Sequence, residues 1–138
     1  MSNLFIASAA LLVIAASSLA FGLRYLFARE YLFYHAQLTG LAWTEIPYHY
    51  QAIILGMLKM VGADLLAFGL ALAWLVLPFS RGESWSFWAI LSLVSVHGFI
   101  SIYVTIALRK LNPAAQTNIF ASCAGVAIAM AALLIASR

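Results

Sequence analysis

Charged side chains are scarce throughout this sequence of 138 residues. They account for 8% of the residues, and hydrophobic residues account for 66%. Soluble proteins instead carry about 25% charged and about 45–50% apolar residues. This imbalance excludes an ordinary soluble domain and indicates an integral membrane protein.

The sequence also has few of the groups that several functions require. Its formal charge of +3 comes from seven basic and four acidic residues; these are scattered, so no nucleic-acid partner is predicted. A single cysteine, Cys123, excludes a disulfide framework or a thiolate metal site within one chain. There is no CxxC pair, HExxH motif or glycine-rich phosphate loop, and no motif identifies a known family.

Long apolar runs are what the sequence has instead. A spanning helix needs about 20 apolar residues, and four runs of sufficient length predict spans over residues 3–23, 52–77, 85–108 and 118–137. The runs are continuous rather than alternating, which argues against a β-barrel. The predicted fold is therefore an all-α integral membrane protein, a single domain of residues 1–138 with four transmembrane helices in an up-down bundle.

The connection between the first two predicted spans, residues 24–51, is rich in aromatic residues. Tyrosine and tryptophan rings gather at the boundary between membrane and water, so we expect an interfacial segment here. The "LTG" at residues 38–40 indicates the end of any helix in this connection. Residues 43–47 predict a turn before the second span, because Pro47 disfavours helix for the residue before it.

Several polar and aromatic residues of this connection form a candidate interfacial cluster: His35, Trp43, Glu45, Tyr48 and His49. An enzyme acting on a lipid at the membrane surface would need such side chains to converge within hydrogen-bonding distance. Their spacing fits no common metal-ligand pattern, so no metal site is predicted.

Two charged residues, Lys59 and Asp64, interrupt the second apolar run. Five positions of a helix separate their side chains by about 140°, so they are poorly placed to pair with each other. Lys59 is near enough to the start of the span to extend its ammonium group to the interface, a snorkelling charge. Asp64 is predicted about 18 Å into the span, near the middle of the membrane, where an ionised carboxylate costs about 2.5–3.5 kcal/mol.

The third predicted span offers Asp64 a partner. It carries His97, Ser101 and Thr105 at i, i+4 and i+8, a polar stripe on one helical face. Measured from the shared hairpin, His97 and Asp64 differ in depth by about 5 Å, so the two can form a polar intramembrane pair. Two interpretations remain open: a structural contact between helices, or a titrating pair on a proton path with Ser101 and Thr105 beside it.

Small residues near Asp64 and basic residues near the span ends predict packing and orientation. Gly62, Ala67, Gly69 and Ala71 are of the kind that lets membrane helices approach closely. The basic residues divide unequally: Arg24, Arg29, Arg109 and Lys110 flank the first and third connections, and Arg81 and Arg138 flank the opposite side. The positive-inside rule then places both termini outside the cytoplasm, and a bacterial inner membrane is the expected location.

Three classes of function are compatible with these features. The first is a non-catalytic protein, either an accessory subunit of a membrane complex or a module that contacts lipid or quinone. It requires no cofactor, is compatible with a bound lipid or quinone, and has membrane lipid, other transmembrane subunits or further copies of itself as partners. The alternatives are a small proton-coupled transporter or channel using Asp64 and His97, and a membrane enzyme acting on a lipid.

Overall fold

The computed structural model describes residues 3–115, 117 and 119–137, and every regular element among them is helical. The elements are α1 (Asn3–Leu26), α2 (Phe33–Thr39), the 3₁₀ helix η1 (Trp43–Glu45), α3 (Tyr48–Ser80), α4 (Ser84–Leu111) and α5 (Ile119–Ala136). By length and composition, α1, α3, α4 and α5 can each cross a membrane. The prediction of an all-α protein with four such helices is confirmed.

The second long helix is longer at both ends than the predicted span 52–77. Pro47 precedes the helix, and its carbonyl accepts hydrogen bonds from Tyr50 N and Gln51 N at 2.9 and 3.1 Å, so α3 begins at Tyr48. Pro78, directly after the predicted span 52–77, lies in the last turn of α3. A proline there removes one backbone hydrogen bond without ending the helix. The first and third helices also extend by up to three residues beyond their predicted spans. Two predicted features, the start of the fourth span at Asn118 and the terminal charge of Arg138, lie outside the described residues.

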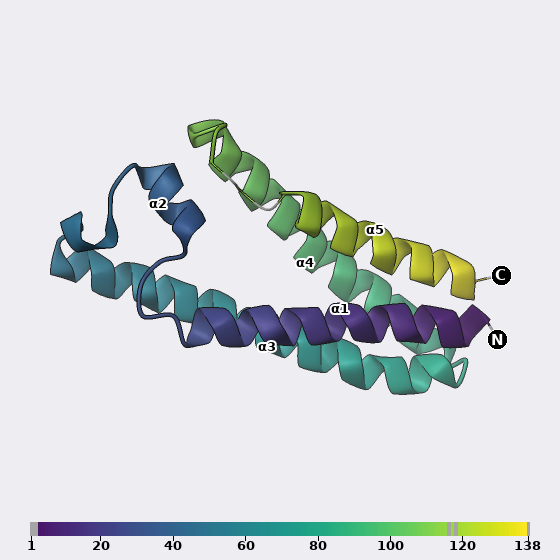
Figure 1. Ribbon diagram of the computed structural model, residues 1–138. Helices are drawn as coiled ribbons and strands as arrows, with labels where there is room; N and C mark the ends of the chain where they lie inside the picture. The colour runs from purple at the N-terminus through teal and green to yellow at the C-terminus, as the bar shows by residue number, and fades with distance from the viewer. Residues whose placement is uncertain (1–2, 116, 118, 138) are drawn as a thin grey trace.

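The four long helices are packed together at one end, and toward the other end the α4–α5 pair separates from the α1–α3 pair (Figure 1). α1 and α3 lie side by side, and α5 packs against α1 and α4. α4 leaves the hairpin with α3 and diverges from it, while α2 lies at the opposite end of the molecule from both termini. In the packed half, side chains from all four long helices contact one another. In the other half, α3 and α4 are farther apart (Figure 1).

The main hydrophobic core occupies the half that contains the termini and the α3–α4 hairpin. Its centre is formed by side chains from all four long helices that are almost completely buried, Leu11, Leu72, Ile90 and Leu133. The hairpin itself turns at Gly82, whose φ of 79° suits a residue without a side chain.

Glycines set the distance between α1 and α3. A Cβ atom added to Gly62 would lie 2.7 Å from Leu26 N and 2.9 Å from Gly22 O, and one added to Gly69 would lie 2.9 Å from Ala15 O. The two backbones are therefore in direct contact, as small residues allow between membrane helices.

The aromatic connection packs against the first part of α3. Tyr31 and Ile46 form a second, smaller core with Leu58, and the Tyr31 hydroxyl donates a hydrogen bond to Leu41 O. α2 ends at Thr39, followed by Gly40 with a φ of 70°, so the helix end predicted from "LTG" is confirmed. The segment expected as a turn before α3 contains one short 3₁₀ helix, η1.

Candidate functional site

A cleft of about 1490 Å³ occupies the half of the molecule away from the main core. Its walls come from the last turns of α1, residues 54–71 of α3, residues 93–109 of α4 and the start of α5, and Leu32, Tyr34 and His35 lie at one end. It forms because α4 diverges from α3 (Figure 1). Ligand pockets are commonly about 300–1,000 Å³, so this cleft has room for an elongated molecule.

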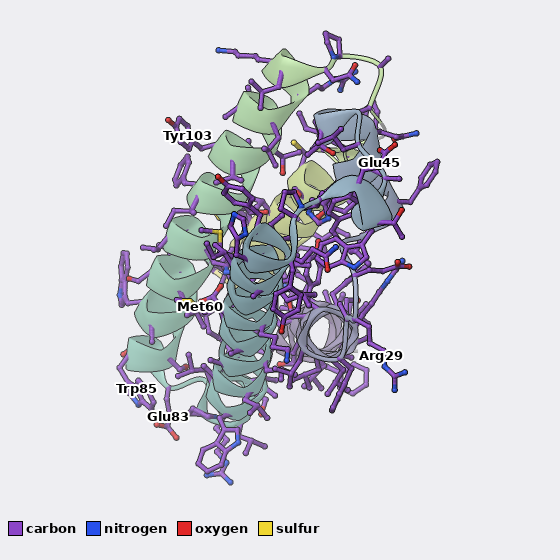
Figure 2. The ribbon with its side chains drawn as sticks, turned by 90° about the vertical axis from the view of Figure 1, so that its left-hand side faces the viewer. Arg29, Glu45, Met60, Glu83, Trp85 and Tyr103 are labelled. Atoms are coloured by element: carbon purple, nitrogen blue, oxygen red, sulfur yellow. The ribbon has the colours of Figure 1, made fainter. Side chains whose placement is uncertain are left out.

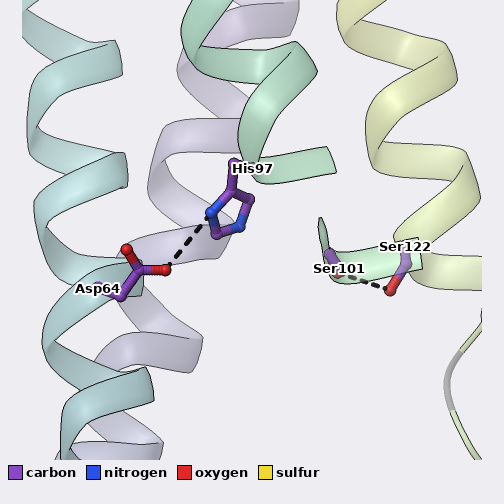
Figure 3. Close-up of polar contacts among 4 residues, drawn as sticks. All are labelled: Asp64, His97, Ser101 and Ser122. Carbon is purple, nitrogen blue, oxygen red and sulfur yellow. Dashed lines mark hydrogen bonds and ion pairs between the residues drawn. The ribbon is translucent and has the colours of Figure 1, made fainter. Parts of the chain in front are cut away.

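Asp64 and His97 meet across this cleft. His97 Nδ1 on α4 lies 3.5 Å from Asp64 Oδ2 on α3 (Figure 3), which is beyond the usual range of a direct hydrogen bond. The His97 side chain is 26% exposed, whereas the Asp64 side chain is 69% exposed. The contact therefore covers the imidazole and leaves most of the carboxylate open to the cleft.

Phe68 completes the surroundings of His97. Its ring stacks on the imidazole with 4.1 Å between centroids and 23° between planes. Because Asp64 and Phe68 are four residues apart, they lie on one face of α3 and both contact His97. The sequence-based prediction paired His97 with Asp64 alone and missed Phe68, although the i, i+4 spacing of Phe68 from Asp64 could have indicated it.

The packing of α1 against α3 fixes the level of Asp64 and Lys59 relative to the end of α1. Gly62 contacts the last turn of α1 at Leu26, and Asp64 lies two residues farther toward the hairpin, about 3 Å. Asp64 is thus level with the last turns of α1, and α3 extends well beyond the end of α1. Lys59 lies about 5 Å to the other side of Gly62 and is exposed, which supports the snorkelling interpretation.

The hydroxyl groups of the polar stripe on α4 make two kinds of hydrogen bond, one within the helix and one to α5. Thr105 Oγ1 donates to the Ser101 carbonyl at 2.8 Å, within the helix. Ser101 Oγ donates to Ser122 Oγ on α5 at 3.3 Å (Figure 3). Both residues line the cleft. The next position at the same spacing, Arg109, also lines it, although the sequence analysis used Arg109 only to predict orientation.

α2 is attached to both sides of the cleft at its wide end. The hydroxyl groups of Tyr25 on α1 and Tyr34 on α2 are hydrogen-bonded to each other. On the other side, Asn112 Nδ2, directly after α4, donates to Gln37 O on α2 at 2.7 Å. Burial raises the pKa of the Tyr34 hydroxyl, so it stays protonated.

His35 is the member of the predicted interfacial cluster that reaches the cleft. Its Nδ1 accepts a hydrogen bond from Leu32 N at 3.0 Å, and burial lowers its pKa. A neutral ring is consistent with both facts, since Nδ1 can accept only when it carries no proton. The Tyr31 ring lies between His35 and Trp43, with centroid distances of 6.1 and 5.0 Å.

The other cluster residues lie in separate surroundings. Glu45 Oε2 accepts a hydrogen bond from Ala42 N at 2.6 Å, which holds the carboxylate on its own turn. Tyr48 is 84% exposed, and His49 is exposed with its ring against Tyr50. Within the described residues, no three His, Cys, Asp or Glu side chains gather as a metal site would require. The structure therefore does not bring the predicted cluster together as a catalytic or metal site.

Known proteins provide no guide to this arrangement. No family model matches the chain, and neither a curated protein nor a solved structure is significantly similar to it. The function has to be inferred from the cleft itself.

The two long walls of the cleft, formed by α3 and α4, differ in polarity. The α3 wall is mainly apolar, with side chains such as Met57, Val61 and Leu65 around Asp64. The α4 wall carries the polar stripe from His97 to Arg109 as well as apolar residues. A cleft of this composition can bind a molecule that has both an apolar chain and a polar group.

Proposed function

We propose that this protein is a non-catalytic integral membrane protein that binds one elongated amphiphile, a lipid or a quinone, between α3 and α4. The observation that carries this proposal is the cleft of about 1490 Å³, with an apolar α3 wall and polar side chains on α4. An apolar chain lying on α3 would replace lipid or water there, and burial of apolar surface favours binding.

This proposal selects one of the two forms of the non-catalytic hypothesis. An accessory subunit needs an outer surface for partner helices, and exposed apolar side chains such as Trp74 and Phe99 provide apolar surface of that kind. Such side chains are equally suited to membrane lipid, however, so they favour neither partner. The cleft is a specific feature, and it favours the binding module.

We also propose a placement in the membrane. The four long helices form an up-down bundle in a bacterial inner membrane, with α2 and the aromatic connection at the cytoplasmic interface and both termini on the other side. The location of both termini at one end of the molecule supports this arrangement (Figure 1). The excess of basic residues at the α2 end supports the orientation.

Filling the cleft tests the binding function. Ala67 and Ala71 on α3 line the cleft, so Ala67→Phe/Ala71→Phe places two rings where the chain of the amphiphile would lie. The protein should be purified in mild detergent and stripped of lipid stepwise, and the retained molecules counted by native mass spectrometry. We expect the unsubstituted protein to keep one amphiphile after the surrounding lipids are lost, and the filled variant to lose it.

A matched control separates filling of the cleft from a general effect of added rings. Ala63 and Ala107 are exposed residues of α3 and α4 that do not line the cleft. The variant Ala63→Phe/Ala107→Phe should keep the amphiphile. Equal retention by the filled variant and the unsubstituted protein would contradict the proposal, as would the absence of any retained amphiphile from the unsubstituted protein.

The contact between Asp64 and His97 favours a second candidate function, a small proton-coupled transporter or channel. Both groups can carry a proton, they lie 3.5 Å apart in an open cleft, and Ser101 and Thr105 continue the polar wall toward the α2 end. Ionisable residues in membrane spans commonly mark such paths.

Flux measurements in liposomes distinguish this candidate from a binding module. Under a pH gradient, the unsubstituted protein should acidify the vesicle interior faster than empty vesicles do, and Asp64→Asn and His97→Ala should each abolish the difference. Unchanged flux in both variants would remove the transporter hypothesis and leave the binding module in place.

A further inference from the structure

The cationic side chains that line the cleft lie at its wide end. Arg24 is in the last turn of α1 and Arg109 is in the last turn of α4, and both line the cleft. α2 extends between these two helix ends, bonded to α1 through Tyr25 and Tyr34 and to the end of α4 through Asn112. The wide end therefore has an arginine on each side.

From this arrangement we propose that the bound amphiphile is an anionic phospholipid, with its headgroup at the α2 end and its acyl chains against α3. The inference rests on the proposed binding function and adds the class of ligand. Arg24 and Arg109 supply the positive charge, and arginine suits phosphate oxygens because its planar group can donate several hydrogen bonds.

Charge complementarity favours an anionic over a neutral headgroup. Among the described residues that line the cleft, two are arginines and one, Asp64, is acidic; the Asp64 carboxylate faces His97 at 3.5 Å. The protonated Tyr34 hydroxyl also lines the wide end. Basic pockets between transmembrane helices on the cytoplasmic side are known sites for anionic headgroups, and the α2 end is the more basic end of this molecule.

The position of the arginines also matches the order of groups in a phospholipid. Arg24 and Arg109 are in the last turns of their helices, which the proposed placement puts at the headgroup region of the bilayer. The apolar α3 wall, including Val61, Leu65 and Phe68, continues from there toward the main core. A quinone bound through its ring at Asp64 and His97 would leave the arginines without a partner.

The test compares two lipids that differ in headgroup charge. Lipid-stripped protein in detergent is titrated with phosphatidylglycerol or phosphatidylcholine of the same acyl chains, and binding is measured by native mass spectrometry. A basic residue near a membrane surface favours anionic lipid by about fivefold. We therefore expect phosphatidylglycerol to bind more tightly, and Arg24→Gln and Arg109→Gln each to reduce that preference about fivefold.

Two exposed arginines outside the cleft are matched controls. Arg29 lies near the same end but points away from the helices (Figure 2), and Arg81 lies in the hairpin at the other end. Arg29→Gln and Arg81→Gln should leave the preference unchanged. Arg24→Lys/Arg109→Lys, which keeps both charges, should retain most of the preference that Arg24→Gln/Arg109→Gln removes.

Removing the carboxylate gives a change in the opposite direction. Asp64→Asn should increase the preference for phosphatidylglycerol, because it removes the one acidic side chain among the described residues that line the cleft. A merely structural effect of Asp64 would not depend on the charge of the lipid.

The outcomes separate this inference from the binding function on which it rests. If neither lipid binds but the purified protein retains another amphiphile, the inference of an anionic phospholipid is overturned and the binding function stands. If the purified protein retains no amphiphile either, the binding function itself is wrong. If both lipids bind equally and binding is lost in Ala67→Phe/Ala71→Phe, an amphiphile binds but the charge inference is overturned. A preference that survives in Arg24→Gln/Arg109→Gln would also overturn it.

Discussion

The two faces of α3 behave differently although they belong to one helix. On one face, Gly62 and Gly69 bring the backbone of α3 into contact with α1. On the other face, Asp64 and Phe68 reach across a cleft to His97. Gly62 and Asp64 are two residues apart, about 200° around a helix, so they point to opposite sides.

The comparison shows how a small helical protein can combine stability with a binding site. Close packing on the α1 face leaves no space and tolerates no added atoms, as in protein interiors generally. The α4 face is in contact from the hairpin as far as His97 and opens beyond it toward α2, so it has space and polar groups. The effects of substitutions should therefore depend on which face they affect.

The largest effect is expected from an added methyl group between α1 and α3. In Gly62→Ala the new Cβ meets backbone atoms of α1 at 2.7 and 2.9 Å, which cannot move aside as a flexible side chain could. Overpacking of this kind costs about 1–3 kcal/mol in free energy of unfolding, measurable by denaturation in mixed detergent micelles.

Gly56→Ala is the matched control, because no atom lies within 4 Å of a Cβ added there. It should stabilise α3 slightly, by about 0.5–1 kcal/mol, since alanine is the better helix former. Similar free energies for the two alanine variants would show that α1 and α3 are not in the close contact described.

Removing a buried hydroxyl group from the packed half should change the free energy of unfolding by a smaller amount and in the opposite direction. Ser8 is almost fully buried on α1, and its Oγ has no hydrogen-bond partner among the described residues. Because an unsatisfied buried polar group is unfavourable, Ser8→Ala should raise the free energy of unfolding by about 1 kcal/mol. Ser17→Ala on the same helix removes an exposed hydroxyl that donates to Val13 O and should bring no such gain.

The contact between Asp64 and His97 should contribute less to the free energy of unfolding than the substitutions at Gly62 and Ser8 change it. Asp64 is largely exposed, and exposed ion pairs contribute about 0.2–1 kcal/mol. A double-mutant cycle with Asp64→Asn and His97→Gln should give a coupling energy in that range. A coupling energy of several kcal/mol would instead mean that the α3–α4 side is packed as firmly as the α1–α3 side.

The smallest effect should be local and dependent on pH. Burial lowers the pKa of His35 below its ordinary value of 6.5, so the neutral form is favoured while α2 is in place. The stability of α2 is therefore complete above that ordinary value and decreases as the pH falls toward the lowered pKa. Hydrogen exchange in residues 33–39, corrected for intrinsic rates, should be faster at about pH 5.5 than at about pH 7.5.

His35→Gln removes the titrating group and should remove this pH dependence. The main core should exchange equally slowly at both pH values, because it does not contact α2. A change of hydrogen exchange with pH in the main core as strong as that in α2 would contradict the comparison, because α2 and the wide end of the cleft would then not open independently of the core.

Much of the fold followed from local features of the sequence. The length of each apolar run predicted the four long helices, and "LTG" predicted the end of α2 at Thr39. At one helix limit a proline explains the difference: Pro78 follows the predicted span 52–77 but lies within the last turn of α3. A proline near a helix end is compatible with either outcome, and the sequence does not distinguish them.

The candidate site was predictable only in part. Helical spacing and depth from the hairpin indicated that Asp64 and His97 can meet, and the stripe through Ser101 and Thr105 was visible as a repeat of four. Arg24 and Arg109 appeared only as orientation signals, because the sequence does not show that the ends of α1 and α4 border one cleft. Ala67 and Ala71, predicted as packing residues, line that cleft.

The sequence alone determined that the chain forms four apolar helices and that few residues can perform chemistry, because hydropathy and composition are properties of each segment. The tertiary structure decided which face of α3 each residue occupies relative to its neighbours, the level of Asp64 beside the end of α1, and the divergence of α4 that opens the cleft. These depend on register and crossing angle between helices, which arise from contacts between residues far apart in the chain.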